Sequence, residues 1–549
     1  MSKQWPRLAA AALGFLWYLK MGGGPTLNPA NTSWAFYGDW RQHWLGWQFF
    51  RDAPWTFPPA LLPALPYPVG TALAFTDSNP LVSILLKPFS PWLPAEAQFI
   101  GPWLALCFTL QGYAGAALAG LVTRNRLEQV LGGALFVLTP VLAVRVGHDT
   151  LCAHWMLLAL LYLALREYDG PKSAARATWV AILIVAIAAG THPYLAAMSL
   201  CLAVTLAVRL WADRLCTPVR AVTAGAMSVL TMFAVWYLCG YLTGASASSS
   251  GFGDYSADLL TLVNPDALSN LWALNLPTGP AQWEGIGYLG AGGIVAALCA
   301  AVVIAVVRQR PARRVWIVAG VCVLLGFYAL SQVVRFAGTP VMTLRGFYSP
   351  FKTVVTAFRA SGRFIWPLHY LILLCGVWGV SRLGDRARRF GGVAALGAVV
   401  LLQAVDLHFD RVWLQPKIFR HAPLSDFALA RGRFQHLALA PMQVLGVCGD
   451  PYEEDHVYRF MMLAARLKLT YNSGLFARVD APPLERTCAA LEESISSNTL
   501  DSGTIYVVAP GSVDRFKAIG AACGRVDGDW ICASRDSDKR FQTYLTAGK

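Results

Sequence analysis

The chain has 549 residues, of which 56% are hydrophobic and 14% are charged, and its mean hydropathy is +0.47. A soluble protein of this size needs far more charge, so the composition argues against a soluble class and predicts a membrane protein. The formal net charge of +14 is spread through short basic clusters between apolar runs. This distribution excludes a nucleic-acid-binding face, because such a face concentrates its cations.

Apolar runs predict about eleven spanning helices, each near the length that crosses roughly 30 Å of hydrocarbon. The runs lie at 7–23, 99–121, 129–146, 151–167, 177–191, 194–211, 219–242, 288–307, 315–334, 364–382 and 391–409. The first run follows Lys3 and Arg7, and no small-residue cleavage site comes after it, so we expect a retained helix. The predicted fold class is a polytopic α-helical membrane protein with its N-terminus in the cytoplasm.

The positive-inside rule supports this count, because every basic cluster then falls on the cytoplasmic side. The clusters are Arg124 and Arg126; Lys172 and Arg176; Arg209, Arg214 and Arg220; Arg308, Arg310, Arg313 and Arg314; Arg382, Arg386, Arg388 and Arg389. The large outside loops are then residues 24–98, 243–287 and 335–363. The apolar segment 80–94 contains Lys87 and several prolines. We interpret it as an interfacial or re-entrant helix, because counting it as a span would invert the topology after it.

The last part of the chain, residues 410–549, differs in composition from residues 1–409. Its short apolar runs look like strands, and helix-like stretches lie between them, which predicts a small α/β domain outside the membrane. Four of the twelve cysteines lie here: Cys448, Cys488, Cys523 and Cys532. An outside location is oxidising, so one or two disulfides are expected, with Cys523 and Cys532 as the favoured pair.

The first outside loop carries the stretch GDWRQHWLGWQFFRDAPW at residues 38–55. Its tryptophans and phenylalanines are typical of an interfacial helix, and Asp39 stands at its start. A carboxylate held at the membrane surface can take a proton from an acceptor hydroxyl, although Asp39 could equally cap the helix that follows. Asp77 lies in FTDSNP at residues 75–80, where a turn or a helix cap is the simpler interpretation.

Ionisable residues gather at two short outside turns. The stretch VRVGHDTLCAHW at residues 144–155 contains Arg145, His148, Asp149 and His154, and GTHPY adds His192 at the next outside turn. So many ionisable groups at helix junctions are costly in a membrane unless they are paired or functional. Histidine and aspartate can be acid–base partners or metal ligands, and a hairpin cap with a core histidine is the alternative.

Two further loops contribute charged residues near the outer ends of helices. Glu284 and Tyr288 lie in QWEGIGYLGAGG, where Glu284 is either functional or a favourable charge at a helix start. Arg359 and Arg363 lie in FRASGRFIWP, and a spacing of four places both on one face if the segment is helical. Two guanidiniums at the outer surface can clamp a phosphate, and pairing with loop carboxylates or lipid headgroups is the alternative.

These features resemble the GT-C superfamily of integral membrane glycosyltransferases, which have many spanning helices and a catalytic carboxylate in a large first outside loop. The motifs GDWxQHxxGWxFFR, TDSxPL, GHDxLCAHW, EGxxYLG and FRASGRFxWP also resemble a bacterial family of membrane proteins within that group. The resemblance covers roughly residues 30–370. It implies a multi-pass protein of the bacterial inner membrane, with the C-terminal domain in the periplasm.

The resemblance implies transfer of a sugar from a polyprenyl-phosphate donor to an envelope glycan, lipid or protein. Asp39 would act as general base, and Arg359 and Arg363 would hold the donor phosphate. His148 and Asp149 would support catalysis, while the residues expected to bind substrate are His43, Asp77, His154, His192, Glu284 and Tyr288.

Asp39 and Asp149 could ligate a divalent ion such as Mg²⁺ or Mn²⁺, and no other cofactor is expected. The sequence has no glycine-rich nucleotide fingerprint, in keeping with a lipid-linked donor. Two alternatives stay open. One is a transporter or flippase of an anionic lipid-linked substrate, although no inverted repeat is detectable. The other is a non-catalytic subunit of a surface-polysaccharide assembly system.

Overall fold

The computed structural model describes residues 4–243, 250–272, 276–307, 312–387, 391–409 and 414–547. The predicted cytoplasmic residues Arg308, Arg310, Arg388 and Arg389 lie outside the described residues, as does Lys3. The chain forms two compact units. Unit 1 comprises Met1–Asn31, Gln98–Val235 and Ala247–Gln415, and unit 2 comprises Thr32–Ala97, Trp236–Ser246 and Pro416–Lys549. Most of the first outside loop of the sequence prediction therefore belongs to the same compact unit as the C-terminal segment.

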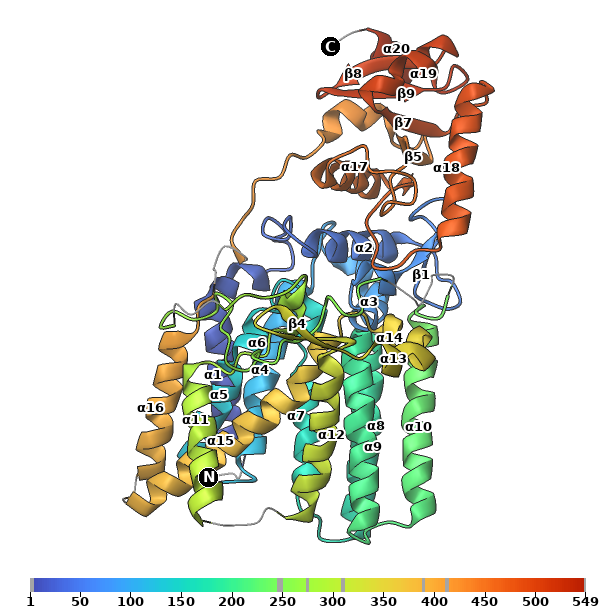
Figure 1. Cartoon of the computed structure of the whole chain (residues 1–549). Helices are drawn as coiled ribbons and strands as arrows, with labels where there is room; N and C mark the ends of the chain where they lie inside the picture. The colour runs from blue at the N-terminus through green and yellow to red at the C-terminus, as the bar shows by residue number, and fades with distance from the viewer. Residues whose placement is uncertain are drawn as a thin grey trace. The chain divides into compact units, whose positions relative to one another are not determined.

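Unit 1 is built from helices with one small hairpin. The helices are α1 (Trp5–Tyr18), α4 (Ile100–Ala119), α5 (Arg126–Val137), α6 (Pro140–Ala143), α7 (Trp155–Leu165), α8 (Pro171–Thr191), α9 (Pro193–Ala212), α10 (Pro218–Leu238), α11 (Ala291–Val307), α12 (Arg313–Ala329), α13 (Arg345–Tyr348), α14 (Lys352–Ala357), α15 (Trp366–Ala387) and α16 (Gly391–Asp406). The hairpin pairs β3 (Val333–Phe336) with β4 (Thr339–Thr343) in antiparallel fashion. Helices α8 and α9 pack against each other, and α9 also contacts α12 (Figure 1).

The predicted count of about eleven spanning helices is wrong. Among the described residues, four helical segments are long and apolar enough to cross a membrane: Pro171–Thr191, Pro193–Ala212, Pro218–Leu238 and Ser361–Arg386. Crossing the hydrocarbon takes about 20 residues. Several predicted spans hold much shorter helices, such as α5 with 12 residues and α7 with 11. The fold is therefore a mostly helical one with far fewer candidate spans than a polytopic protein of the expected class.

Two of these short helices show why the apolar runs were misleading. The predicted span 129–146 is interrupted after α5, where Thr139 takes an extended conformation before Pro140 starts α6. This break is expected, because a residue that precedes proline is disfavoured in the helical conformation. Helix α7 is apolar all round, and most of its side chains are buried inside the protein. Such a helix is a core element by burial, and its hydrophobicity alone does not make it a span.

Helices α1 and α4 approach each other closely at glycines. A Cβ atom added at Gly14 would lie 2.1 Å from the carbonyl oxygen of Phe108, and one added at Gly112 would lie 2.1 Å from that of Ala10. Small residues let two helix backbones come this near, as in helix pairs of membrane proteins. The pair α1 and α4 therefore depends on the absence of side chains at both positions.

Unit 2 combines an N-terminal helical part with a C-terminal sheet. The N-terminal part holds α2 (Trp40–Asp52), the two-stranded sheet of β1 (Leu61–Leu62) and β2 (Thr71–Ala72), α3 (Pro80–Leu86) and the 3₁₀ turn Lys87–Trp92. The segment 80–94 therefore forms two short helical pieces, and neither reaches the length of a span. In the C-terminal part, the helices are α17 (Glu454–Leu467), α18 (Ala481–Ser496), α19 (Val513–Ala518) and α20 (Lys539–Thr546).

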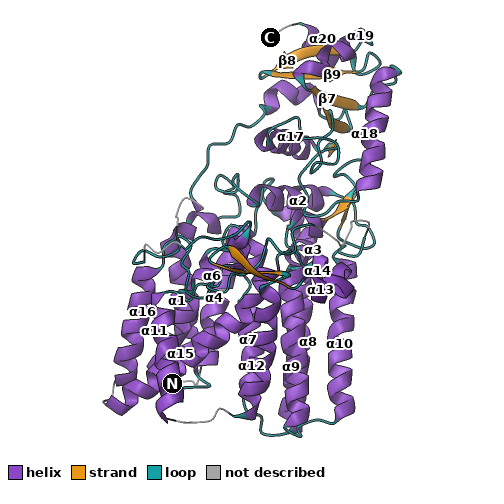
Figure 2. Ribbon diagram, viewed as in Figure 1, coloured by secondary structure: helices purple, strands orange, loops and turns teal. Residues whose placement is uncertain are grey.

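The C-terminal sheet has five strands in the order β6-β5-β7-β9-β8. Figure 2 labels β7, β8 and β9 of this sheet. These are β5 (His436–Ala440), β6 (Thr470–Tyr471), β7 (Thr504–Val508), β8 (Ala522–Val526) and β9 (Asp529–Ala533). Strands β5, β6 and β7 are parallel, and β9 pairs antiparallel with both β7 and β8. Their apolar side chains pack with α18 and α19 in a core that includes Ala438, Ile495, Val508, Phe516 and Cys532.

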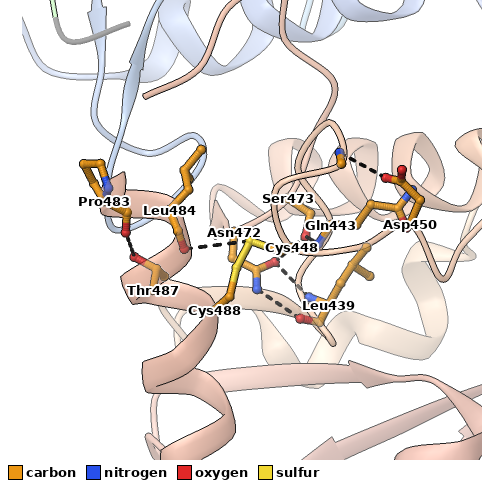
Figure 3. Close-up of a disulfide and its surroundings, with 11 residues drawn as sticks. Leu439, Gln443, Cys448, Asp450, Asn472, Ser473, Pro483, Leu484, Thr487 and Cys488 are labelled. Atoms are coloured by element: carbon orange, nitrogen blue, oxygen red, sulfur yellow. Dashed lines mark hydrogen bonds between the residues drawn. A yellow bond between two sulfur atoms is a disulfide. The ribbon is translucent and has the colours of Figure 1, made fainter. Parts of the chain in front are cut away.

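Two disulfides link the four cysteines of this segment. Cys523 and Cys532 join facing positions of β8 and β9, and this is the pair that the sequence favours. Cys448 and Cys488 join the loop after β5 to α18 (Figure 3). Nearby, the Asn472 amide accepts a hydrogen bond from the Leu439 N–H at 2.9 Å and donates one to the Leu439 carbonyl at 3.0 Å. The side chain therefore extends the backbone pairing at the end of β5.

Candidate functional site

A buried cluster of three charged side chains lies in unit 1. Arg145 donates from Nη1 to Oε2 of Glu284 at 2.6 Å. Arg363 donates to the same carboxylate twice, from Nε at 2.9 Å and from Nη2 at 2.8 Å. The side chains of Arg145 and Arg363 are only 6% and 9% exposed. Two guanidiniums share one carboxylate, so the cluster keeps one positive charge in excess.

The electrostatics of this cluster follow from its geometry. Burial alone would raise the pKa of Glu284, but Arg363 and Arg145 outweigh it and hold the pKa of this carboxyl well below its usual range. His148 adds to this effect, so its ring lies near enough to act on the carboxylate. Burial lowers the pKa of Arg145, while Glu284 opposes that shift. The Nε atom of Arg145 is buried and has no hydrogen-bond partner among the described residues. Glu284 is therefore an anion at neutral pH.

The N-terminal end of α9 holds Arg363 from the other side. The Arg363 guanidinium carbon lies 4.6 Å from the ring centre of Tyr194, a cation–π contact. The Tyr194 hydroxyl accepts a hydrogen bond from the Ala360 N–H at 2.8 Å. His192 caps the same helix by accepting from the Tyr194 N–H at 3.2 Å, and its ring lies 5.5 Å from that of His148. The structure therefore brings His148, His192 and Arg363 into one neighbourhood.

Arg359 differs from Arg363 in having no ion-pair partner in the described chain. It lies between the end of α14 and the 3₁₀ turn Ser361–Ile365, so the two arginines do not share one face of an α-helix as predicted. Its guanidinium carbon lies 5.1 Å from the ring centre of Tyr255. That ring packs edge-on against Trp283, which precedes Glu284 and is 57% exposed. A half-buried cation and an exposed indole therefore adjoin the buried cluster.

A 3₁₀ turn covers Asp149–Cys152; His148 precedes it and Asp149 is its first residue. The His148 N–H donates to the Arg145 carbonyl at 2.9 Å, which ties this turn to the cluster. Asp149 is 1% exposed, and its backbone carbonyl accepts from the indole N–H of Trp103 at 3.0 Å. His148 is therefore the more accessible of the two ionisable groups.

His154 and Tyr288 lie inside packed protein. His154 is fully buried, with Nδ1 2.7 Å from the Tyr370 hydroxyl and its ring 4.1 Å from that of Trp366. The Tyr288 hydroxyl donates to Asp406 at 2.9 Å, and this carboxylate also accepts from the Ala291 N–H. Both residues were predicted to bind substrate, and in the structure each is engaged by the core instead.

The remaining predicted residues belong to unit 2. Asp39 occupies the N-cap position of α2, but its side chain makes no capping hydrogen bond. His43 is 2% exposed on α2. Asp77 has a left-handed backbone with φ 55°, and Asn79 caps α3 by accepting from Val82 N–H at 3.4 Å. The turn interpretation of FTDSNP thus agrees with the local conformation.

The catalytic role of Asp39 stays a prediction. So does the divalent ion at Asp39 and Asp149, because those two carboxylates belong to different compact units.

The sequence placed Arg145 among the clustered ionisable residues but gave it no role, and it did not select Tyr194 or Tyr255. Arg145 was visible as a cation beside His148 and Asp149, yet its partner lies 139 residues away in the chain. The signal that could have found it was charge balance, because an isolated arginine at a helix junction requires a carboxylate. The tyrosines gave no comparable signal.

Two family models match the chain. One is described as a domain of unknown function, DUF6311, and matches residues 11–408. The second is described as the DUF6311 C-terminal domain and matches residues 426–534. No curated protein matches the sequence. The first match contains the whole Arg145–Glu284–Arg363 cluster.

Proposed function

The chain belongs to the DUF6311 family, whose domain is described as one of unknown function, and we propose from its charged site that it is a membrane-bound glycosyltransferase that takes its sugar from a polyprenyl-phosphate donor. The observation that carries the proposal is the group of three arginines and one carboxylate in unit 1. Arg359 is partly exposed without an ion-pair partner among the described residues, beside the buried pair Arg145 and Arg363 that share Glu284. The excess positive charge suits a phosphate.

The phosphate role divides between the arginines according to their contacts. Arg363 and Arg145 are anchored by Glu284, so they supply a fixed positive field at low exposure. Within the described residues Arg359 makes one cation–π contact, with Tyr255, and no ion pair, so its donors are available to phosphate oxygens. A preorganised field of this kind stabilises charge that develops on a leaving group during reaction.

The aromatic surface beside Arg359 supports a sugar as the transferred group. Tyr255 and the exposed Trp283 offer ring faces, and aromatic side chains with one apolar face and one polar tip suit a partly wet site. The four apolar helical segments of unit 1 support a membrane location, where a polyprenyl chain would be dissolved.

The proposed reaction is a single displacement at the anomeric carbon. The acceptor oxygen forms the new bond to that carbon while the bond from carbon to the phosphate oxygen breaks. The phosphate leaves with the electron pair as polyprenyl phosphate, and Arg359 stabilises its charge. The acceptor proton goes to a base, and we assign this role in unit 1 to His148, which is partly exposed beside the cluster.

The decisive variant is Arg359→Gln. This side chain is partly exposed and makes no ion pair within the described residues, so its loss should leave the fold intact. Arg345→Gln is the matched control, since Arg345 is an exposed arginine in the same stretch of chain. Lipid-linked sugars and surface glycans would be compared by mass spectrometry in cells without the gene and in cells that express each variant.

We expect donor to accumulate and the glycan product to disappear in the deletion strain and with Arg359→Gln, while Arg345→Gln restores the product. Protein abundance in the membrane fraction must be equal for both variants. If Arg359→Gln restores full transfer, the phosphate role is wrong. If the deletion strain instead fails to move the lipid-linked sugar across the membrane, the protein is a flippase. Asp39→Asn tests the predicted base of the first loop separately.

A further inference from the structure

Unit 2 contains a large cavity apart from the residues discussed above. Its volume is about 850 Å³, and it lies between α2, the segment 87–96 and the C-terminal part of α17. The size falls within the range of small-molecule sites. Its lining is Trp44, Gln48, Arg51, Asp52, Ala53, Trp55, Lys87, Pro88, Ser90, Pro91, Leu93, Ala95, Glu96, Leu424, Arg431, Met462, Ala465, Arg466 and Lys468.

The lining carries a strong excess of positive charge. Five of its side chains are cations and two are carboxylates, so three positive charges are unbalanced. Arg466 forms an ion pair with Glu96 at 2.7 Å, and Lys468 lies 3.6 Å from Asp52. Both carboxylates of the lining are therefore paired. The unbalanced cations are Arg51, Lys87 and Arg431. Of these, Arg51 donates to the carbonyls of Ser90, Pro94 and Ala95 and so holds the cavity wall.

Lys87 is a buried cation without a carboxylate partner in the described residues. It is 5% exposed, and its ammonium lies 4.0 Å from the ring centre of Phe50 and 4.6 Å from that of Trp55. Its one hydrogen bond, to the Pro54 carbonyl, is long at 3.4 Å. Burial lowers the pKa of Lys87 to about 8. A buried ammonium with so few acceptors is costly unless a ligand completes its surroundings.

Two neutral donors in the same wall are also unsatisfied. The Trp44 indole N–H and the Ser90 hydroxyl are buried and lack a hydrogen-bond partner within the part of the chain that the structure describes. A buried donor without an acceptor costs about 1–3 kcal/mol. Both atoms are closed off even from a water-sized molecule, so they belong to the packing of the wall, and the cations Lys87 and Arg431 are what the cavity offers to an occupant.

We propose that this cavity binds an anionic saccharide, with its phosphate or carboxylate on Lys87 and Arg431 and its ring against Trp55. The charge excess of the lining selects an anion. Trp55 is 54% exposed and offers a flat apolar face, against which the C–H groups of a sugar ring can lie. This site is independent of the phosphate role proposed for Arg359.

Binding of glucose 6-phosphate, inorganic phosphate and glucose to the purified full chain would be measured by calorimetry. Lys87→Met is the test variant. Lys517→Met is the matched control, because Lys517 lies 4.7 Å from the ring centre of Trp530 elsewhere in unit 2. We expect glucose 6-phosphate to bind most tightly, at least tenfold weaker binding for Lys87→Met, and a change below twofold for Lys517→Met.

A second variant keeps the test decisive if Lys87→Met does not fold. Arg431→Gln removes an exposed cation of the rim whose hydrogen bond to the Arg466 carbonyl is long at 3.5 Å, so the fold should tolerate it. It should weaken binding of glucose 6-phosphate several-fold. Equal binding by the wild type and both variants would overturn the site. Equal affinity for glucose 6-phosphate and inorganic phosphate would overturn the saccharide assignment, and anionic phospholipid vesicles that compete for the cavity would assign it to a lipid headgroup.

Discussion

Replacing Glu284 with glutamine is the sharpest test of the buried charge cluster. The substitution keeps the shape of the side chain but removes the carboxylate that both guanidiniums contact, and these side chains are only 6% and 9% exposed. Three charge-assisted hydrogen bonds of 2.6–2.9 Å lose their anionic acceptor. Removing one partner of a buried ion pair costs about 3–5 kcal/mol, because the remaining charges stay buried.

The glutamine oxygen can still accept one of these bonds, so we expect a loss at the lower end, about 3 kcal/mol. That value corresponds to roughly a hundredfold change in the unfolding equilibrium constant. The assay is equilibrium unfolding of the purified protein in mixed detergent micelles. Glu167→Gln is the control, because Glu167 pairs with Arg314 at the surface with 78% of its side chain exposed. An exposed pair contributes about 0–1 kcal/mol.

The pH dependence adds a second check of the same variant. The folded pKa of Glu284 lies below its unfolded value of about 4.3, so the carboxylate contributes full stability above that value. This contribution is lost as pH falls through the folded pKa. The difference in free energy of unfolding between the wild type and Glu284→Gln should therefore be constant from about pH 5 to 7 and become smaller at lower pH. A loss for Glu284→Gln no larger than that for Glu167→Gln would refute the reasoning.

Three other predictions concern stability. Cys448→Ser should lower the free energy of unfolding by about 4 kcal/mol, because its disulfide joins residues 40 apart in the chain. Cys523→Ser should lower it by about 3 kcal/mol, because the residues it joins are 9 apart. Equal losses would contradict the argument from loop length. Asn472→Ala should cost about 2 kcal/mol and speed hydrogen exchange at the Leu439 amide, and unchanged exchange there would count against it. Gly14→Ala should force α1 away from α4 and lower the free energy of unfolding by about 1–3 kcal/mol, which would appear as a lower melting temperature. An unchanged melting temperature would contradict the close packing.

Much of the secondary structure could be predicted, but the number of spans could not. Predicted ranges 177–191, 194–211, 219–242 and 364–382 overlap the four segments that are long and apolar enough to cross a membrane. The run at 151–167 looked equivalent. It holds α7, whose leucines are buried by neighbouring helices. Hydropathy measures avoidance of water, and both lipid and a protein interior satisfy it.

The segments of the C-terminal part were easier to predict because strands and helices alternate with turn residues between them. The run GTIYVVAP contains β7, and DHVYRFMMLAARLKL covers most of α17. The amphipathic pattern of α17 is what makes it visible, with one apolar face toward the sheet.

The contacts of the candidate site, in contrast, could not be predicted from local sequence patterns. Arg363 and Glu284 were each selected for their residue type and position near a helix end. Their pairing joins positions 79 residues apart, and a single sequence contains no information about such a contact. The phosphate clamp predicted for Arg359 and Arg363 therefore divides: Arg363 pairs with a loop carboxylate, which was the alternative left open, and Arg359 makes no ion pair within the described residues. The physical cause is the carboxylate of Glu284, which pairs with Arg363.

The make-up of unit 2 has a consequence for how the protein is made. Its first segment ends at Ala97 and its last begins at Pro416, so about 320 residues must be translated between them. At about 5–20 residues per second this takes on the order of half a minute. Helix α2 emerges early, yet Arg41 on it acquires its partners Glu454 and Asp455 only near the end of synthesis. Until then the face of α2 that packs against α17 has no cover, so the growing chain is expected to need a chaperone or a membrane surface during that interval.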